Sequence, residues 1–166
     1  MRVLQPMTAS AVLEPGRVRV PRKNTPIPML DLIKVLHDGH VVVFGYTPSR
    51  RRLAGALAQV RAENGNGVKV YNHNLGNIGL APRMKAPFYH YGAGIFLVFP
   101  EFKAGAVAYW QTVQKCTVAL AAFEQLDPTR AAHAFHRCGY HTTPPDAYAK
   151  VLRPLFWSSH KMLEAP

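Results

Sequence analysis

The chain has 166 residues, 48% of them hydrophobic, which is enough for one domain with a sizeable core. Twenty Lys and Arg against nine Asp and Glu give a formal net charge of +11, which predicts an anionic partner: nucleic acid, a membrane surface or a bacterial wall. The sequence carries no zinc-finger, basic-zipper or RNA-recognition signature, so we expect no specific nucleic-acid partner.

The N-terminal sixteen residues lack an apolar core of signal-peptide length, and no segment reaches the roughly eighteen apolar residues of a membrane span. We therefore expect no membrane span and a product that is synthesised in the cytoplasm. A target outside the membrane would then require a non-standard delivery route.

The two cysteines, Cys116 and Cys138, are too few for a disulfide framework. Both fall in predicted helices, where a buried thiol is the commonest outcome, and one bridge between them is an open alternative. The pattern of Cys138 beside His136 or His141 is compatible with a thiol hydrolase, but a cysteine inside a helix argues against it.

Residues 1–28 are predicted to form an extended arm, and residues 29–166 one folded domain. Prolines and glycines interrupt the arm, and the alternation from Arg17 to Val20 allows one edge strand. The arm could dock a partner. The folded part begins with a short amphipathic helix over 29–37 that ends at Asp38-Gly39, followed by an apolar run, Val41–Phe44, that periodicity assigns to neither helix nor strand.

The stretch 53–78 is the centre of the prediction. Leu53, Leu57 and Val60 recur at helical spacing, Thr47-Pro48 supplies an N-cap and first-turn proline, and Gly65 supplies a left-handed stop. The arginines at 50–52 and 61 are assigned to the solvated side of this helix.

Glu63 continues the apolar side of this helix and is expected to face the body of the protein. Partial burial and the negative end of the helix dipole both favour the protonated carboxyl, as a general acid near neutral pH requires. The alternative is a surface glutamate that is ion-paired to Arg61 or Lys69.

The segment 64–78 carries three glycines and five asparagines, which predicts a turn-rich loop with many amide groups. Such groups recognise sugars beside aromatic faces, and Tyr71 and His73 are placed for stacking. The runs Phe88–Tyr91 and Ile95–Phe99 flank Gly92-Ala93-Gly94, which predicts a small β-hairpin.

The C-terminal half is predicted to be helical. One long helix spans 102–125, a second begins at Asp127-Pro128 and runs to Cys138, and a third begins at Thr143-Pro144-Pro145 and is kinked at Pro154. The fold class is therefore α+β, mostly helical, with a small hairpin lobe.

Four segments resemble the flagellar-type and autolysin-type peptidoglycan glucosaminidases and their lytic transglycosylase relatives, which share the lysozyme-like fold. Residues 58–67, AQVRAENGNG, resemble the family's "AQ…E(S/T)GWG", and residues 71–78, YNHNLGNI, resemble "(S)NNLFGIK". Residues 99–110 are similar to the family's "F…S…G…Y…L" segment, where a helix begins. Gly139-Tyr140-His141 with Tyr148-Ala149 resembles "GYATD…YA". The match spans about 50–152.

The resemblance implies a lysozyme-like catalytic domain that cleaves the β-1,4 bonds of the peptidoglycan glycan strand. It identifies Glu63 with the catalytic acid and Tyr140 with a tyrosine near the cleft. The predicted sugar contacts are Tyr71, Asn72, Asn74 and Asn77. The chain departs from the family at Asn66, where a tryptophan is usual, and it lacks the phenylalanine of "LFG", so we expect a cleft with fewer aromatic groups. It also departs at Thr143, where an aspartate is usual.

The chemistry depends on a second carboxylate, because glycosidases normally use two. Glu101 is the nearest candidate after the hairpin, and a helix N-terminal charge is the competing explanation for it. A single acid would instead fit participation by the substrate's acetamido group, or the lytic route in which the muramic 6-hydroxyl attacks. We expect a glucosaminidase, with a lytic transglycosylase or a muramidase as the alternative.

The sequence gives weaker evidence for other kinds of functional site. His133 and His136 share one helix face, as do His37 and His40, but neither pair has the further ligands of a zinc site, so we expect no metal and no cofactor. An enzyme of this kind would act in the periplasm or cell wall after delivery by a virion, a lysis pore or a secretion machine, with an immunity partner possible. The alternative is a non-catalytic wall-binding or virion protein.

Overall fold

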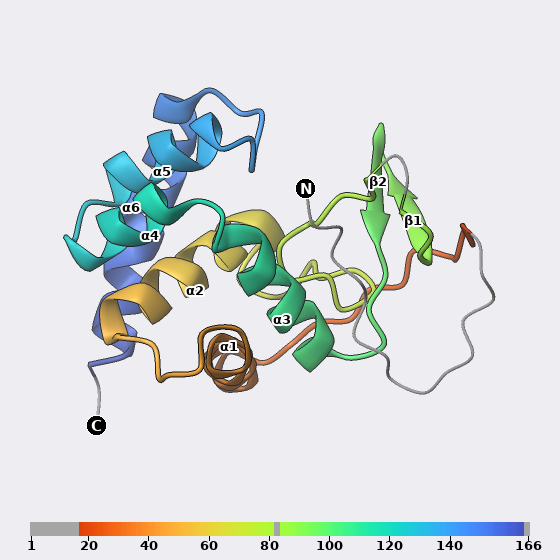
Figure 1. The fold of residues 1–166 in the computed structure, drawn as a ribbon, viewed down its shortest axis with the longest axis horizontal. Coiled ribbons are helices and arrows are strands. Elements are labelled where there is room, and N and C mark those ends of the chain that lie inside the picture. The colour runs from red at the N-terminus through yellow and green to blue at the C-terminus, as the bar shows by residue number, and fades with distance from the viewer. Residues whose placement is uncertain (1–16, 82–83, 165–166) are drawn as a thin grey trace.

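The computed structural model describes residues 17–81 and 84–164 (Figure 1). Within these residues a mostly helical part is joined to a small two-stranded antiparallel sheet, which confirms the predicted fold class. Predictions for residues 1–16 lie outside the described residues. The elements are α1 Met29–Phe44, α2 Arg50–Asn64, β1 Phe88–Tyr91, β2 Gly94–Leu97, α3 Phe102–Val113, α4 Thr117–Glu124, α5 Pro128–Arg137 and α6 Pro145–Met162.

Helix α2 is the central element of the helical part. Its residues 53–60 are all buried, and the helix packs against α6, α4 and α1. A Cβ at Gly55 would overlap the ring of Phe123, so glycine is what lets α2 and α4 approach so closely. The helix ends at Gly65 with φ 55°, as predicted, but its N-cap is Ser49 and not Thr47, because the Ser49 hydroxyl accepts a hydrogen bond from the Arg52 amide at 3.0 Å.

The expected end of α1 at Asp38-Gly39 is wrong. The helix continues to Phe44 and takes in the undecided apolar run, and it stops at Gly45, where φ is 78°. A Cβ on Gly39 would lie 3.0 Å from the Cβ of Ala106, so this glycine serves the close packing of α1 against α3. A glycine required by packing cannot be distinguished from a helix stop by local sequence.

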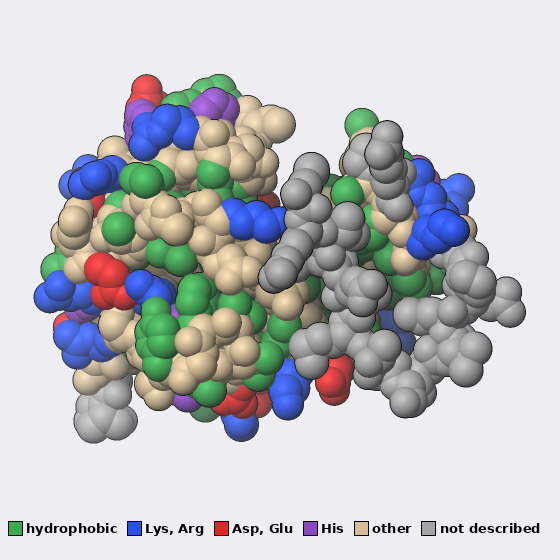
Figure 2. Space-filling view, viewed as in Figure 1, with side chains coloured by type: hydrophobic (Ala, Val, Ile, Leu, Met, Phe, Trp, Pro, Cys, Tyr) green, Lys and Arg blue, Asp and Glu red, His purple; other side chains and the backbone are tan. Residues whose placement is uncertain are grey.

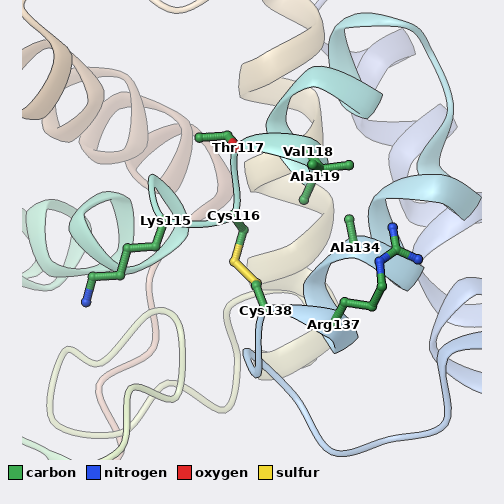
Figure 3. Close-up of a pocket in the computed structure, with 8 residues that line it drawn as sticks. All are labelled: Lys115, Cys116, Thr117, Val118, Ala119, Ala134, Arg137 and Cys138. Atoms are coloured by element: carbon green, nitrogen blue, oxygen red, sulfur yellow. A yellow bond between two sulfur atoms is a disulfide. The ribbon is translucent and has the colours of Figure 1, made fainter.

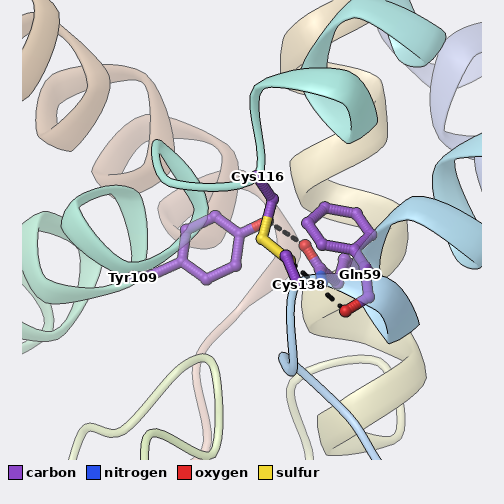
Figure 4. Close-up of a disulfide and its surroundings, with 5 residues drawn as sticks. Gln59, Tyr109, Cys116 and Cys138 are labelled. Carbon is purple, nitrogen blue, oxygen red and sulfur yellow. Dashed lines mark hydrogen bonds between the residues drawn. A yellow bond between two sulfur atoms is a disulfide. The ribbon is translucent and has the colours of Figure 1, made fainter.

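The single helix expected over 102–125 is also wrong, because the chain breaks between α3 and α4. Cys116 lies at this break and is bonded to Cys138 at the end of α5, with the two Cα atoms 5.9 Å apart (Figure 4). The expectation of buried thiols inside helices is therefore wrong, and the open alternative, one bridge between the two cysteines, is confirmed. The break allows α4 to turn back so that Leu120 and Phe123 are buried in the core.

The last two helices largely follow the prediction. The Asp127 carboxylate accepts a hydrogen bond from the Arg130 amide at 2.9 Å, and Pro128 opens α5. Helix α6 continues through Pro154 to Met162 and packs against both α2 and α5. None of the helices in the two described ranges is long and apolar enough to cross a bilayer.

The small lobe is built from the hairpin, the loop after α2 and the chain before α1. Tyr91 pairs with Gly94, so the hairpin turn has two residues instead of the expected three. The Val20 amide donates to the Phe88 carbonyl at 2.8 Å, so the chain before α1 pairs with β1 over a short stretch, as the alternation allowed. The segment 64–78 forms consecutive turns, as predicted. The division into an arm and a domain stays a prediction.

Candidate active site

Glu63 lies in the last turn of α2, where its partly buried carboxylate meets the loop and α6. Its Oε1 accepts a hydrogen bond from the Tyr148 hydroxyl at 3.1 Å, and its Oε2 accepts one from the Asn77 amide at 3.3 Å. The same amide nitrogen lies 3.2 Å from the Glu63 carbonyl. Both partners of the carboxylate are therefore neutral groups.

The ion-paired alternative for Glu63 is wrong within the described residues. Arg61 points its guanidinium at Asn66 and at the hydroxyls of Ser158 and Ser159, at 2.8 to 2.9 Å. Arg61 is partly buried against α6 and does not lie on a solvated side, and burial lowers its pKa. No salt bridge between described residues involves Glu63.

Burial raises the pKa of Glu63 above its ordinary value of 4.5. The hydrogen bonds from Asn77 and Tyr148 stabilise the anion and act in the opposite direction, but they only partly offset the loss of hydration. A carboxyl in this situation retains its proton to higher pH than a surface glutamate does. That is the property a general acid needs.

Tyr148 is the site residue that the sequence prediction did not assign to the site. Burial and the neighbouring Glu63 charge both raise the pKa of Tyr148, so its hydroxyl stays a donor. The His141 ring stacks on it with centroids 3.9 Å apart. Tyr148 belongs to the last segment of the family resemblance, and that motif is the signal in the sequence that could have assigned it to the site.

Gln59 and Tyr109 form a buried layer behind Glu63. Gln59 precedes Glu63 by one helix turn, and its Oε1 accepts a hydrogen bond of 2.6 Å from the Tyr109 hydroxyl (Figure 4). Burial raises the pKa of Tyr109, with the Glu63 charge as a second cause. Gln59 and Tyr109 are both buried, so this pair lies in the interior of the protein and not at its surface.

Tyr140, which the resemblance identifies with a tyrosine near the cleft, bonds to the loop after α2. Its hydroxyl donates to the Gly76 carbonyl at 3.0 Å, and a Cβ on Gly76 would lie 2.9 Å from that hydroxyl oxygen. Tyr140 therefore holds the loop that carries Asn77, and it takes no part in the hydrogen bonds to the Glu63 carboxylate.

The loop asparagines divide into two groups. Asn77 contacts Glu63, whereas Asn72 and Asn74 are buried. The Asn74 amide donates to the carbonyls of Ile78 and Leu97 at 3.0 Å each, and its oxygen accepts from the Ile78 amide. Asn72 is likewise bonded to the chain before α1, at Lys23 and Pro21. Asn74 thus fastens the loop to itself and to β2, and Asn72 fastens it to the chain before α1.

Two further predicted residues lie outside the hydrogen-bonded group around Glu63. Tyr71 packs against Tyr91 and beneath the guanidinium of Arg22. The Nδ1–H of His73 donates to the Phe99 carbonyl at 2.8 Å. Glu101 is exposed at the N-cap of α3, and its side chain makes no capping hydrogen bond.

One depression of about 180 Å³ lies beside the disulfide, on the side of α4 and α5 (Figure 3). It shares no residue with the group around Glu63. The depression is lined by Lys115, Cys116, Thr117, Val118, Ala119, Ala134, Arg137 and Cys138.

Among the described residues no three His, Cys, Asp or Glu side chains come together as metal ligands.

The chain matches no protein-family model and no curated protein. Among solved structures it is similar to the glycoside hydrolase domain of FlgJ from Salmonella typhimurium, with a TM-score of 0.56 and 18% identity over 83% of this chain and 92% of that one. It is also similar to a peptidoglycan hydrolase mutant from Sphingomonas sp. A1, with a TM-score of 0.55 and 16% identity over 80% and 96% of the two chains. The chain therefore has the lysozyme-like fold that its sequence predicts, in common with these two hydrolases.

Proposed function

We propose that this protein is a peptidoglycan hydrolase that cleaves β-1,4 bonds of the glycan strand with Glu63 as the general acid. The observation that carries the proposal is the Glu63 carboxyl itself, which is partly buried and has a raised pKa. Its hydrogen-bond partners among the described residues are the neutral groups of Asn77 and Tyr148. Its place at the end of the central helix, on a fold common to two hydrolases, supports the same activity.

In this mechanism the Glu63 proton passes to the glycosidic oxygen while the bond from that oxygen to the anomeric carbon breaks. The positive charge that develops on the sugar ring needs a nucleophile. In hydrolysis water attacks the anomeric carbon and its proton returns to the Glu63 carboxylate. Tyr148 and Asn77 hold the carboxyl in position through both steps.

The nucleophile distinguishes the two forms of the proposal. No second carboxylate among the described residues is hydrogen-bonded to the Glu63 group, and Glu101 is exposed. This arrangement favours a single-acid route, in which the substrate's acetamido group assists and a glucosaminidase product results. The same observation supports the alternative, a lytic transglycosylase, in which the muramic 6-hydroxyl attacks and gives its proton to Glu63.

The proposed site of action is the periplasm or cell wall. Disulfides form and persist in oxidising environments outside the cytoplasm, and Cys116 is bonded to Cys138. The disulfide thus supports action beyond the membrane.

The test is digestion of purified sacculi by the wild type and by Glu63→Gln. We expect Glu63→Gln to lower the rate by at least about 10³-fold, since an amide cannot protonate the leaving oxygen. Glu101→Gln is the matched control and should retain most of the activity. A wild type that releases no fragments would contradict the proposal and favour a non-catalytic wall-binding protein.

Mass spectrometry of the fragments then decides the bond. A reducing N-acetylglucosamine end identifies a glucosaminidase, a reducing muramic acid end a muramidase, and an anhydro end a lytic transglycosylase. The single-acid route with acetamido assistance would be excluded by full activity on glycan strands whose acetamido groups have been removed.

A further inference from the structure

Charge is distributed unevenly over the molecule. We define the β-lobe as residues 17–28, 64–81 and 84–100. It contains no Asp or Glu, whereas the helical part carries all eight carboxylate side chains of the described residues. Six Lys and Arg side chains of the β-lobe are exposed, namely Arg17, Arg19, Arg22, Lys23, Lys69 and Lys85.

These cations have no carboxylate partner within the described residues. In the helical part Arg52 pairs with Glu124 at 3.0 Å and Lys34 with Asp38 at 2.8 Å. Among the described residues, the Arg17 guanidinium is the only one of these cations with a hydrogen bond, to the carbonyls of Ala81 and Met84. Within the same residues the positive charge of the β-lobe is therefore uncompensated, and Lys and Arg gather on its surface at the right of the space-filling view (Figure 2).

Arg22 is held in a fixed place within this surface. Its guanidinium carbon lies 4.7 Å from the ring centroid of Tyr71 and 4.5 Å from that of Tyr91, and the two ring centroids are 5.4 Å apart. The arginine thus covers two rings that come from the loop and from the end of β1. Cation–π contacts of this kind fix the side chain, and no hydrogen bond within the described residues uses its N–H groups.

A guanidinium with free N–H groups recognises carboxylates through two parallel hydrogen bonds. The β-lobe is also continuous with the Glu63 site, because the loop that carries Tyr71 also carries Asn77, whose amide contacts the Glu63 carboxylate. Asn24, two residues after Arg22, bridges to Tyr71. The loop from Tyr71 to Asn77 thus links the Glu63 site to Arg22, and the inference places a bound polymer along this loop.

We infer that the β-lobe surface, centred on Arg22 above Tyr71 and Tyr91, binds the stem-peptide carboxylates of the same peptidoglycan strand whose glycan lies at Glu63. The inference rests on the proposed function and adds a second recognition element to it. The sugars are positioned at Glu63, and the peptide branches, which carry the anionic charge of the polymer, are held by the cations. The surface would raise affinity and on-rate without touching the bond that breaks.

The test measures pelleting with sacculi that have been stripped of phosphate polymers, in the Glu63→Gln background so that no cleavage occurs. The variant Arg19→Gln/Arg22→Gln/Lys23→Gln should bind roughly tenfold more weakly, as expected for three exposed ion pairs. The matched control, Lys150→Gln/Arg153→Gln/Lys161→Gln, removes the same charge from exposed positions of α6 and should bind within about twofold of the parent. Equal losses in the two triple variants would overturn the inference, because net charge alone would explain them.

A second substrate identifies the carboxylates as the ligand. Sacculi treated with an amidase keep the glycan but lose the stem peptides, and the parent and the β-lobe variant should bind this stripped glycan with equal affinity. A parent that still binds the stripped glycan more tightly than the β-lobe variant would also overturn the inference. Arg22→Lys keeps the charge but not the paired N–H groups and should give an intermediate loss, and thermal melting checks that every variant is folded.

Kinetics separate this inference from the proposed function. With Glu63 present, the β-lobe variant should raise KM about tenfold and leave kcat unchanged, because its residues do not contact the reacting atoms. If the wild type cleaves nothing but its binding still depends on stem peptides, the proposed function fails and the surface inference stands. If the wild type cleaves the glycan but the β-lobe variant has an unchanged KM, the proposed function stands and the surface inference fails.

Discussion

At the residue scale, the Glu63 carboxyl is held by opposing effects. Burial destabilises its anion, whereas the Tyr148 hydroxyl and the Asn77 amide stabilise it, and burial dominates. The carboxyl therefore retains its proton to higher pH than a surface glutamate does, and the two hydrogen bonds orient it. A cationic partner would have cancelled the effect of burial, and the nearest arginine, Arg61, is instead directed at Asn66 and two serines.

The raised pKa makes Glu63 a cost to stability at neutral pH. Below its ordinary value of 4.5 the carboxyl is protonated in both the folded and the unfolded chain; above it, the unfolded chain ionises first and is favoured. The free energy of unfolding therefore falls as pH rises from 4.5 to the raised folded pKa. We expect Glu63→Gln to be more stable than the wild type at pH 7, with the difference vanishing below about pH 4.

Urea titrations across this pH range measure that difference. Glu101→Gln, which removes an exposed carboxylate without a hydrogen bond in the structure, is the control and should follow the wild-type curve closely. A Glu63→Gln protein that is equally stable at every pH would contradict the burial of the carboxyl.

Tyr148 and Tyr140 make separable contributions. Tyr148→Phe removes a donor to the Glu63 anion, which should raise the pKa of Glu63 further and move the alkaline limb of the pH–rate profile to higher pH. Tyr140→Phe loses only the bond to the Gly76 carbonyl, so it should cost about 1 kcal/mol of stability and leave that limb in place.

Steady-state rates on soluble glycan fragments between pH 4 and 9 measure the alkaline limb of each variant, and thermal melting measures the stability. An equal displacement of this limb in both variants would contradict the separation of roles. An alkaline limb that does not move in Tyr148→Phe would contradict it as well.

At the element scale, the disulfide connects the two helices that flank the outer side of the core. Cys116 lies at the start of α4 and Cys138 at the end of α5, two residues before Tyr140. Tyr140 in turn holds the loop at Gly76. The covalent link therefore fixes the end of α5 from which the loop of the candidate site is held.

Removing this link should destabilise the protein. For a sequence separation of 22 residues, loop-closure entropy predicts a loss of roughly 3 kcal/mol in Cys116→Ser/Cys138→Ser. Differential scanning calorimetry should show a lower Tm for this variant, and the wild type in reductant should approach the same value. A wild type whose Tm is insensitive to reductant would contradict a bridge that is formed and stabilising.

At the scale of the whole molecule, the helical part and the β-lobe differ in both core and charge. Residues 53–60 of α2 are buried on all sides by helices, whereas the β-lobe buries few large side chains and its sheet has two short strands. Its buried hydrophobic residues are Ile27, Val70, Leu75, Tyr89 and Leu97. Local opening is therefore expected to begin in the β-lobe.

Hydrogen exchange provides the measurement. Amides of β1 and β2 should exchange at least about 10²-fold faster than those of residues 53–60, because they can open without exposing the helical core. Glu63→Gln should leave this order unchanged. Equal protection in the hairpin and in α2 would contradict the separation into a strong helical core and a weaker lobe.

Features with local physical causes could be predicted from the sequence. Asp127-Pro128 opens α5 and Gly65 ends α2 because caps act through the hydrogen bonds of a single turn. The hairpin, the turn-rich loop and the partly buried Glu63 follow from spacing in the same way. The resemblance of short segments then predicted the lysozyme-like fold.

The tertiary structure decided what depends on contacts distant in sequence. Gly39 permits close packing against Ala106 instead of ending α1, and the pairing of Cys116 with Cys138 accompanies a helix break that periodicity had bridged. The sequence by itself determined a glutamate at the end of a helix and favoured an inward orientation over a surface ion pair. Only the folded chain decided that Tyr148, 85 positions away, would donate to it, because packing α6 against α2 brings the two side chains together.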